Sequence, residues 1–368
     1  MSTISEKELS DFRNDAAAWF AENTNADPGF MLPLTFMEVG TDQQFNFLRD
    51  WQNKVYEAGY LGAAWPKEYG GGGLDQKFQT IATEEMARAN GPIMLNMGTD
   101  EERKRYIKGI LSAEDIWCQG FSEPENGSDL GNAQTKAVRD GDDWVLNGSK
   151  IWTTQGNYAK YMILLARTNP DAPNKYAGLS FFLSPMQVEG IETVPIRKLT
   201  GEYGFTQTFF TDARIPGDSL MGKEGEGWLV AMRTLEYERG VKGGQPGGYV
   251  MRASDPFEIV ELARKATRGG KPALEDPVIK DQLIQLMIEA RSLQLNSKRG
   301  HIQPLVQDKP ASLALSSKLM ATEFMRRLNE FAITLQGQRG AYYVGEPDAY
   351  DEGLWQRAYL TDPAQHYW

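Results

Sequence analysis

The stretch GFSEPENGSD at residues 120–129 and the run WTT at residues 152–154 decide how this sequence is interpreted. Pro, Asn, Gly, Ser and Asp all favour turns, so the first stretch fits a plain polar turn. Its glycines and small hydroxyl side chains also let backbone N–H groups approach a flat ring or a phosphate. Trp152 beside two threonines fits either core packing or an aromatic face laid on a ring whose edge is hydrogen-bonded. The residues alone leave these alternatives open.

Three regions that differ in their pattern of apolar, polar and turn-forming residues predict three domains, at residues 1–115, 116–222 and 223–368. In the first region, apolar residues at steps of three and four predict a helix from Phe45 to Ala58, and a second helix is expected from about Phe78 to Ala89. The middle region holds strand-like runs at 143–146, 150–152, 161–166, 179–183 and 206–210. Asn147-Gly148, between the first two runs, predicts a β-hairpin turn. We therefore expect a compact β-barrel or sandwich here.

The third region has two apolar stripes at helical spacing, which predict a helix bundle. The stripes consist of Val278, Leu283, Met287, Ala290 and Leu293, and of Met320, Phe324, Leu328, Phe331 and Leu335. The predicted fold class is α+β, with helices, then strands, then helices.

Composition excludes several classes of protein. The net charge of −11 disfavours nucleic-acid binding, because phosphates attract clustered Lys and Arg. A single cysteine, Cys118, excludes an internal disulfide framework, and two distant histidines make a His-based triad or a metal site a poor candidate. If the chain is an enzyme, carboxylates or a cofactor do the chemistry. The acidic N-terminus lacks the pattern of a signal peptide or leader, which predicts a cytoplasmic location without a membrane span.

Taken in order, these motifs resemble the acyl-CoA dehydrogenase family. The family's first motif is a hydroxyl residue, Glu-Pro, two variable residues and Gly-Ser-Asp. This chain has SEPENGSD at residues 122–129. The family's second motif is Trp, one variable residue and Thr, which this chain has at residues 152–154. Further matches are WPKEYGG at 65–71, EEMAR at 84–88 and FFTDARIP at 209–216. The resemblance covers nearly the whole chain. It implies an N-terminal helical domain, a middle β-domain and a C-terminal four-helix bundle.

The resemblance also implies FAD as the cofactor. Phe121 and Ser122 would contact the flavin ring through backbone or hydroxyl groups. Trp152 would pack on the isoalloxazine, and Thr154 would bond near N5 and O4. Gln119 is assigned to the same cofactor-binding set. For substrate binding, Ser128 would contact the CoA chain. The alternative is that Ser128 is only a turn residue.

The catalytic base implied by the resemblance is Glu238. Abstraction of an α-proton needs a carboxylate whose pKa approaches the operating pH. In LEYERG, residues 235–240, Glu238 matches the base of long-chain and isovaleryl-type members, which precedes an arginine. Arg239 matches that arginine, which could tune or orient the base, and Glu236 matches an acidic position beside the CoA thiol arm. A solvated, charged helix face is the alternative.

The sequence departs from the family in several places. The residues that hold FAD from a neighbouring subunit are only partly matched, at Arg268 and at Gln336-Gly337. About a helix is missing after Asn96, and the chain stops at Trp368, where the family continues through a late loop. We expect these segments to be omitted from the sequence rather than absent from the protein.

The expected function is FAD-dependent α,β-dehydrogenation of an acyl-CoA to the 2-enoyl-CoA, with electrons passed to an electron-transferring flavoprotein. A homodimer or homotetramer is expected, and a heteromer stays open. Two other functions stay open as well. One is an acyl-CoA oxidase, and the other is a non-catalytic or co-catalytic subunit of a heteromeric dehydrogenase.

Overall fold

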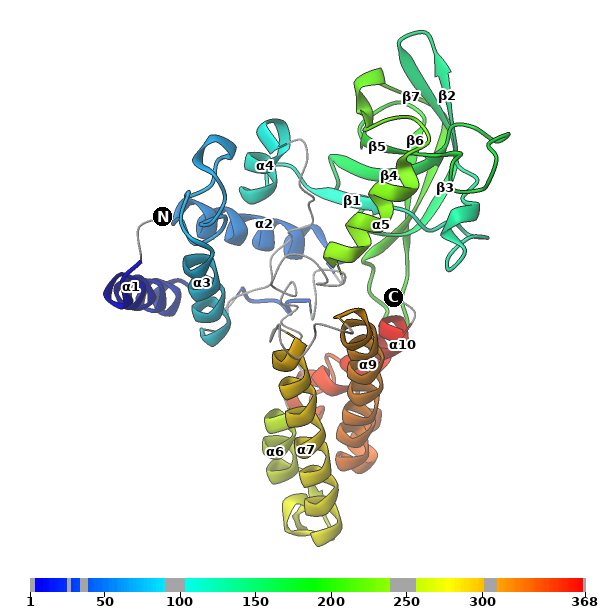
Figure 1. Ribbon diagram of the computed structural model, residues 1–368. Coiled ribbons are helices and arrows are strands. Elements are labelled where there is room, and N and C mark those ends of the chain that lie inside the picture. Colours follow the sequence, from blue (N-terminus) through cyan, green and yellow to red (C-terminus); the bar gives the residue numbers. More distant parts are fainter. Residues whose placement is uncertain are drawn as a thin grey trace. The chain divides into compact units, whose positions relative to one another are not determined.

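The computed structural model describes residues 4–24, 28–33, 39–89, 103–238, 256–300 and 310–366 (Figure 1). The chain divides into two compact units. The first consists of residues 1–198 and 202–234, and the second of residues 199–201 and 235–368.

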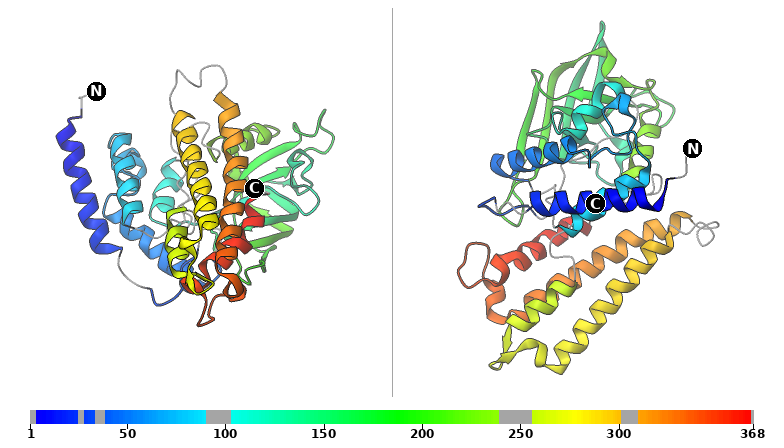
Figure 2. Two further views of the ribbon diagram at one scale, coloured as in Figure 1. Left: turned by 90° about the horizontal axis from the view of Figure 1, so that it is seen from below. Right: turned by 90° about the vertical axis from the view of Figure 1, so that its left-hand side faces the viewer.

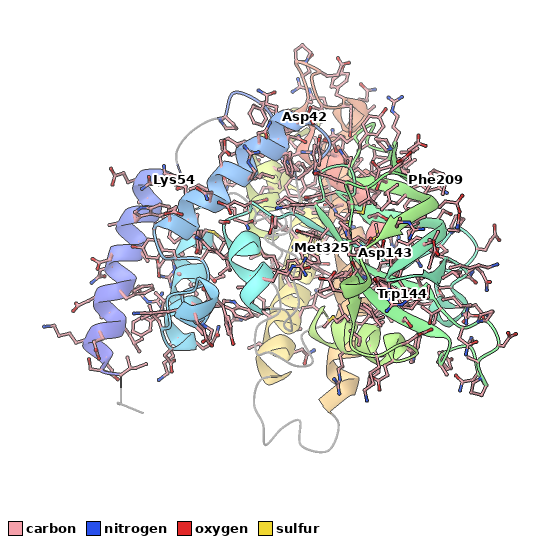
Figure 3. All side chains as sticks on the ribbon, turned by 90° about the horizontal axis from the view of Figure 1, so that it is seen from above. Asp42, Lys54, Asp143, Trp144, Phe209 and Met325 are labelled. Carbon is pink, nitrogen blue, oxygen red and sulfur yellow. The ribbon has the colours of Figure 1, made fainter. Side chains whose placement is uncertain are left out.

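The N-terminal part of the first unit is helical, with α1 (Glu6–Asn23), α2 (Asp42–Glu57), α3 (Gln76–Arg88) and α4 (Arg103–Leu111). The first three helices begin after Ser5, Thr41 and Asp75, whose side chains each accept a hydrogen bond from a first-turn backbone N–H. Figure 3 labels Asp42 and Lys54 near the two ends of α2. The helices predicted from residue periodicity and texture, α2 and α3, are therefore confirmed.

The rest of the first unit contains, within the described residues, a sheet of eight strands. Their bounds are β1 (Trp117–Gly120), β2 (Lys136–Asp140), β3 (Asp143–Thr154), β4 (Tyr161–Arg167), β5 (Leu179–Pro185), β6 (Ile191–Ile196), β7 (Phe205–Ile215) and β8 (Leu220–Met221). Neighbours follow the order β6-β7-β3-β2-β4-β5-β8, and β1 pairs with β4. Pairing is antiparallel except for β1 with β4 and β2 with β4.

A single residue pair, Lys136 and Arg167, joins β2 to β4. On either side of this joint, the strands form two groups that share one apolar core, as in a sandwich. Trp144 of β3 meets Phe182 of β5 edge to face, with ring centroids 5.2 Å apart. Figure 3 shows Trp144 beside Asp143 at the start of β3. Each fully buried apolar side chain of this kind stabilises the fold by about 1.5–3 kcal/mol.

The predicted hairpin at Asn147-Gly148 is wrong. β3 runs without interruption from Asp143 to Thr154, and the hairpin turn lies earlier, between β2 and β3 at Gly141. Asn147 instead lies opposite a β-bulge in β7. Its side-chain amide donates to the Asp212 carboxylate at 2.9 Å, and its carbonyl accepts from the Asp212 N–H at 3.0 Å. The second bond satisfies the backbone N–H of Asp212, a residue that the bulge leaves out of the register with β3.

Helix α5 (Gly227–Glu238) follows β8 and begins against β5. A Cβ at Gly227 would lie 2.4 Å from the backbone carbon of Ser180, so only glycine permits this approach. Nearby, the Trp228 ring lies 4.6 Å from that of Tyr176.

The second unit is mainly helical, with α6 (Pro256–Lys265), α7 (Pro277–Gly300), α9 (Pro310–Leu335) and α10 (Leu354–His366). A short hairpin of β9 (Thr267–Arg268) and β10 (Lys271–Pro272) precedes α7. Figure 2 shows α7 and α9 as long neighbouring helices, and α9 also packs against α10. Within the described residues of both units, the short 3₁₀ helices are η2 (Lys67–Tyr69), η3 (Leu130–Asn132), η4 (Gly217–Ser219), η5 (Ala273–Glu275), η6 (Gly337–Ala341) and η7 (Tyr350–Gly353).

The two predicted apolar stripes are confirmed only in part. On α7, Leu283 and Ala290 are buried, but Val278 is 62% exposed and Ile279 occupies the inner face in its place. On α9, Phe324, Leu328 and Leu335 are buried, whereas Met320 is 41% exposed. None of the described helices is both long and apolar enough to cross a membrane.

Cys118 provides a test of the β-sandwich core. Its thiol is buried in β1, and burial raises its pKa. Because the thiolate is the nucleophile that attacks iodoacetamide and displaces iodide, we expect this reagent to leave the native protein unmodified and to label it as denaturant unfolds the first unit. Mass spectrometry across a urea titration measures this, and rapid labelling without denaturant would contradict the buried position of Cys118.

Candidate functional site

The structure brings together the two segments that the sequence singled out. Residues 121–123 leave β1, and residues 150–154 end β3. The Ile151 N–H donates to the Ser122 carbonyl at 2.9 Å. The Lys150 ammonium donates to the Phe121 carbonyl at 3.0 Å. The segments are thus joined by a backbone bond and by a charged side chain.

Glu123 and Lys150 form a buried ion pair beside this junction, with Oε1 and Nζ 2.8 Å apart. The Lys150 side chain is 0% exposed and that of Glu123 is 5% exposed. Glu123 also accepts the backbone N–H groups of Gln134, at 2.5 Å, and Thr135, at 2.8 Å. Burial by itself raises the pKa of the Glu123 carboxyl, but Lys150 and these donors bring it below its ordinary value. Burial lowers the pKa of Lys150, and Glu123 opposes this change.

Trp152 lies at a β-bulge. Pairing between β3 and β7 shifts between Lys150 and Thr153, and Trp152 adopts a left-handed φ of 60°. A residue with a Cβ costs about 1–2 kcal/mol in this conformation. The indole is 47% exposed and touches Phe205 edge to face, with ring centroids 6.1 Å apart. The bulge therefore turns a large flat ring away from the core, which disagrees with the core-packing interpretation of Trp152.

The neighbouring predicted residues differ in what they can offer a ligand. Phe121 is buried with its ring against Phe181, so only its backbone is left for contact with a ligand. Gln119, in β1, is half-buried. Ser122 and Thr154 are half-buried as well, and neither hydroxyl bonds to another described residue. Both hydroxyls are free to hydrogen-bond a ligand.

Ser128 is exposed, in the loop that follows Glu123. The next residue, Asp129, pairs with Lys175 at 2.6 Å. Further along, the Arg167 guanidinium donates to the carbonyls of Gly131 and Ala133, both at 2.9 Å. The loop that carries Ser128 is therefore anchored from the end of β4 and from the β4–β5 connection.

Glu236 and Glu238 lie in the last turn of α5. Their side chains, and Arg239 entirely, fall outside the described residues. The predicted gap after Asn96 and the end of the chain at Trp368 fall outside them too. The assignments at these positions stay predictions.

The remaining predicted cofactor residues belong to the second unit. Arg268 is exposed at the tip of the β9–β10 hairpin, next to Gly269 and Gly270. Gln336 is buried: its amide nitrogen donates to the Ala332 carbonyl at 3.2 Å, and its oxygen accepts from Gln356 at 2.8 Å. Gly337 follows at a left-handed φ of 57°. The Gln336 side chain is thus engaged inside its own unit.

Two residues of the site, Glu123 and Lys150, are missed by sequence reasoning. Glu123 lies in the 120–129 stretch and Lys150 in the strand-like run 150–152, but neither motif assigns them a role. The available signal is Lys150 itself, a charged residue next to apolar Ile151 and Trp152 in a strand-like run. Lysine is almost never fully buried unless it is paired, so a lysine in such a run predicts a buried partner.

Comparisons with known proteins give matches in all three regions of the chain. Family models match three segments: "Acyl-CoA dehydrogenase, N-terminal domain" at residues 36–114, "Acyl-CoA dehydrogenase, middle domain" at 118–213 and "Acyl-CoA dehydrogenase, C-terminal domain" at 225–365. The chain belongs to the acyl-CoA dehydrogenase family. It is accordingly an oxidoreductase, and its three-domain fold agrees with the expected class.

Individual relatives agree with the family models. Acyl-CoA dehydrogenase IpdE1 of Mycolicibacterium smegmatis is 34% identical over 97% of this chain and 92% of its own length. The human mitochondrial short-chain specific acyl-CoA dehydrogenase is 32% identical over 80% of this chain and 74% of its own. Among solved structures, "Tcur3481-Tcur3483 steroid ACAD" superposes with a TM-score of 0.76 at 27% identity, covering 99% of this chain and 94% of that one.

The dehydrogenase family is flavin-dependent, with FAD typical. The described residues fit a flavin: an outward-facing indole offers a flat apolar surface, and the Ser122 and Thr154 hydroxyls offer polar partners for a ring edge.

The strain at Trp152 can be measured with two variants that remove the same ring. We expect Trp152→Gly to be more stable to unfolding than Trp152→Ala by about 1 kcal/mol, since glycine has no Cβ to resist a left-handed φ. Urea unfolding of the two FAD-free variants measures the difference. Equal stability, or a more stable alanine variant, would show that the bulge is not strained.

Proposed function

We propose that this dehydrogenase binds FAD at Trp152 and converts an acyl-CoA thioester to the 2-enoyl-CoA. The single observation that carries the proposal is the Trp152 bulge, which exposes a flat aromatic ring on the segment that carries Thr154 and that is bonded to Ser122 through the Ile151 N–H. It supports the FAD assignment because a strained, outward-facing tryptophan has no role in the core. FAD, when bound, accepts the β-hydrogen as hydride.

Glu238 is the proposed general base, which takes the α-proton of the thioester. Its place in the last turn of α5, immediately before Arg239, matches the base of long-chain and isovaleryl-type members. Arg239 is proposed to orient or tune this carboxylate. Glu236 and Ser128 are proposed to contact the CoA chain, and Gln119 and the Phe121 backbone to line the flavin site. Arg268, Gln336 and Gly337 are proposed to serve FAD across a subunit boundary.

The proposed electron acceptor is an electron-transferring flavoprotein, and the proposed location is the cytoplasm. A homodimer or homotetramer follows from the proposed FAD contacts across subunits. One observation favours a heteromer instead. Two similar structures are named as pairs of proteins, "Tcur3481-Tcur3483 steroid ACAD" and the ChsE4-ChsE5 complex from Mycobacterium tuberculosis, at 27% and 25% identity. A co-catalytic subunit of a heteromeric dehydrogenase is therefore the second candidate function.

The deciding experiment is an absorption spectrum of the purified protein, followed by anaerobic titration with acyl-CoAs. The panel should contain short straight-chain, branched and ring-bearing acyl groups, because the relatives include a short-chain enzyme and a steroid enzyme. Flavin bands that bleach with one acyl-CoA support the proposal and identify the substrate class. Absence of flavin contradicts the FAD assignment for the isolated chain, and co-expression with a partner subunit then tests the second candidate.

Glu238→Gln tests the base. The amide keeps the size of the side chain but cannot take a proton, so we expect FAD content to be unchanged and the rate of flavin bleaching to fall by about 10²–10⁴-fold. Glu226→Gln, the same change before the first turn of α5, is the matched control and should bleach at the wild-type rate. Near-normal bleaching in Glu238→Gln would place the base elsewhere.

A further inference from the structure

We propose that the buried Glu123–Lys150 ion pair is a positioning device, which holds the two candidate flavin-contacting segments at a fixed separation. The inference rests on the proposed FAD site, and neither residue touches the cofactor in it. Glu123 and Lys150 are positioning residues, because they act through Phe121, Ser122 and Trp152.

Connectivity is the first argument. Lys150 lies two residues before Trp152, and Glu123 directly follows Ser122. The Lys150 ammonium bonds both the Glu123 carboxylate, at 2.8 Å, and the Phe121 carbonyl, at 3.0 Å. Together with the Ile151 N–H on the Ser122 carbonyl, these contacts tie every residue from 121 to 123 to residues 150–151. A displacement of Lys150 would therefore change the distance between the Ser122 hydroxyl and the Trp152 ring.

Electrostatics is the second argument. A fully buried ammonium is costly to desolvate, and replacing a buried ion pair by apolar residues of similar volume is often neutral or stabilising. Stability alone therefore does not account for this pair. What an ammonium offers here is several hydrogen bonds from one atom, which fix the geometry of a carboxylate and a carbonyl together. The lowered pKa of Glu123 agrees with a carboxylate held in its charged form at this point.

The Trp152 bulge is the third argument. A strained backbone persists only where the surrounding structure constrains it. The register shift begins immediately after Lys150, whose own pairing with Thr208 is regular. Lys150 is thus the last anchored residue before the strained one.

The experiment compares Glu123→Gln, Lys150→Met and the double variant Glu123→Gln/Lys150→Met in the full-length protein. Each single change leaves one buried group without its charged partner and lowers stability. The double variant removes both charges and recovers stability, but it has no donor for the Phe121 carbonyl. For each protein we measure the urea midpoint, the dissociation constant for added FAD, and amide hydrogen exchange at residue 151.

Leu146→Ala is the matched control. Leu146 is fully buried on the same strand and packs in the sandwich core, outside the Glu123–Lys150 contacts. The alanine variant loses stability because it creates a cavity, and it leaves the contacts of Glu123 and Lys150 in place. This variant should unfold at a lower urea concentration than the wild type, but its FAD affinity and its exchange rate at residue 151 should equal those of the wild type.

A positioning role predicts that the double variant binds FAD about ten- to hundredfold more weakly than the wild type although its stability recovers. It also predicts faster exchange at residue 151. A purely structural ion pair predicts that FAD affinity recovers together with stability, and that result overturns the inference. If the wild type takes up no FAD, the proposed cofactor site is wrong. Exchange at residue 151 then decides alone: faster exchange in the double variant supports the positioning role, and unchanged exchange overturns it.

Discussion

The ammonium group of Lys150 lies inside the first unit, and the neighbouring structure depends on how its charge is neutralised. Glu123 supplies the opposite charge and also accepts two backbone N–H groups, from Gln134 and Thr135. The carbonyl of Thr135 in turn accepts the N–H of Arg167 at 2.7 Å, beside the one pair that joins β2 to β4. The ion pair therefore connects the exit of β1, the end of β3 and the joint between the two strand groups of the sandwich.

This arrangement explains how a strained residue can be kept near the end of β3. A left-handed tryptophan would relax if the flanking chain could shift by one residue. On one side, Lys150 is fixed by its charge and by the Phe121 carbonyl. On the other side, Thr153 resumes pairing with Thr206, and the Gln155 N–H donates to the Gly204 carbonyl at 3.1 Å. Both anchors lie within three residues of Trp152, so the exposed ring is held from two directions.

Sequence patterns predict the elements whose cause is local. The period of α2 and the strand-like runs of the middle region follow from the residues themselves, so their positions can be inferred directly. Asn147-Gly148 misleads the prediction because the pair is typical of a hairpin turn, whereas Asn147 here lies within β3 and bonds Asp212 at the bulge of β7, far away in the chain. Val278 fails for a related reason. It fits the spacing of a buried stripe, yet only the packing of α7 against α6 and α9 determines that Ile279 faces inward.

The candidate site shows the same division. The family motifs at 122–129 and 152–154 are enough to propose one flavin site for Ser122 and Trp152, whereas burial of Lys150 against Glu123 is a tertiary fact that no short motif encodes. The two parts of the proposed activity also depend on different elements of the fold. The cofactor surface depends on β1 and β3, which the ion pair holds together, and proton abstraction depends on α5, which Gly227 packs against β5. Because different contacts support the two elements, loss of cofactor and loss of the base are distinct failures.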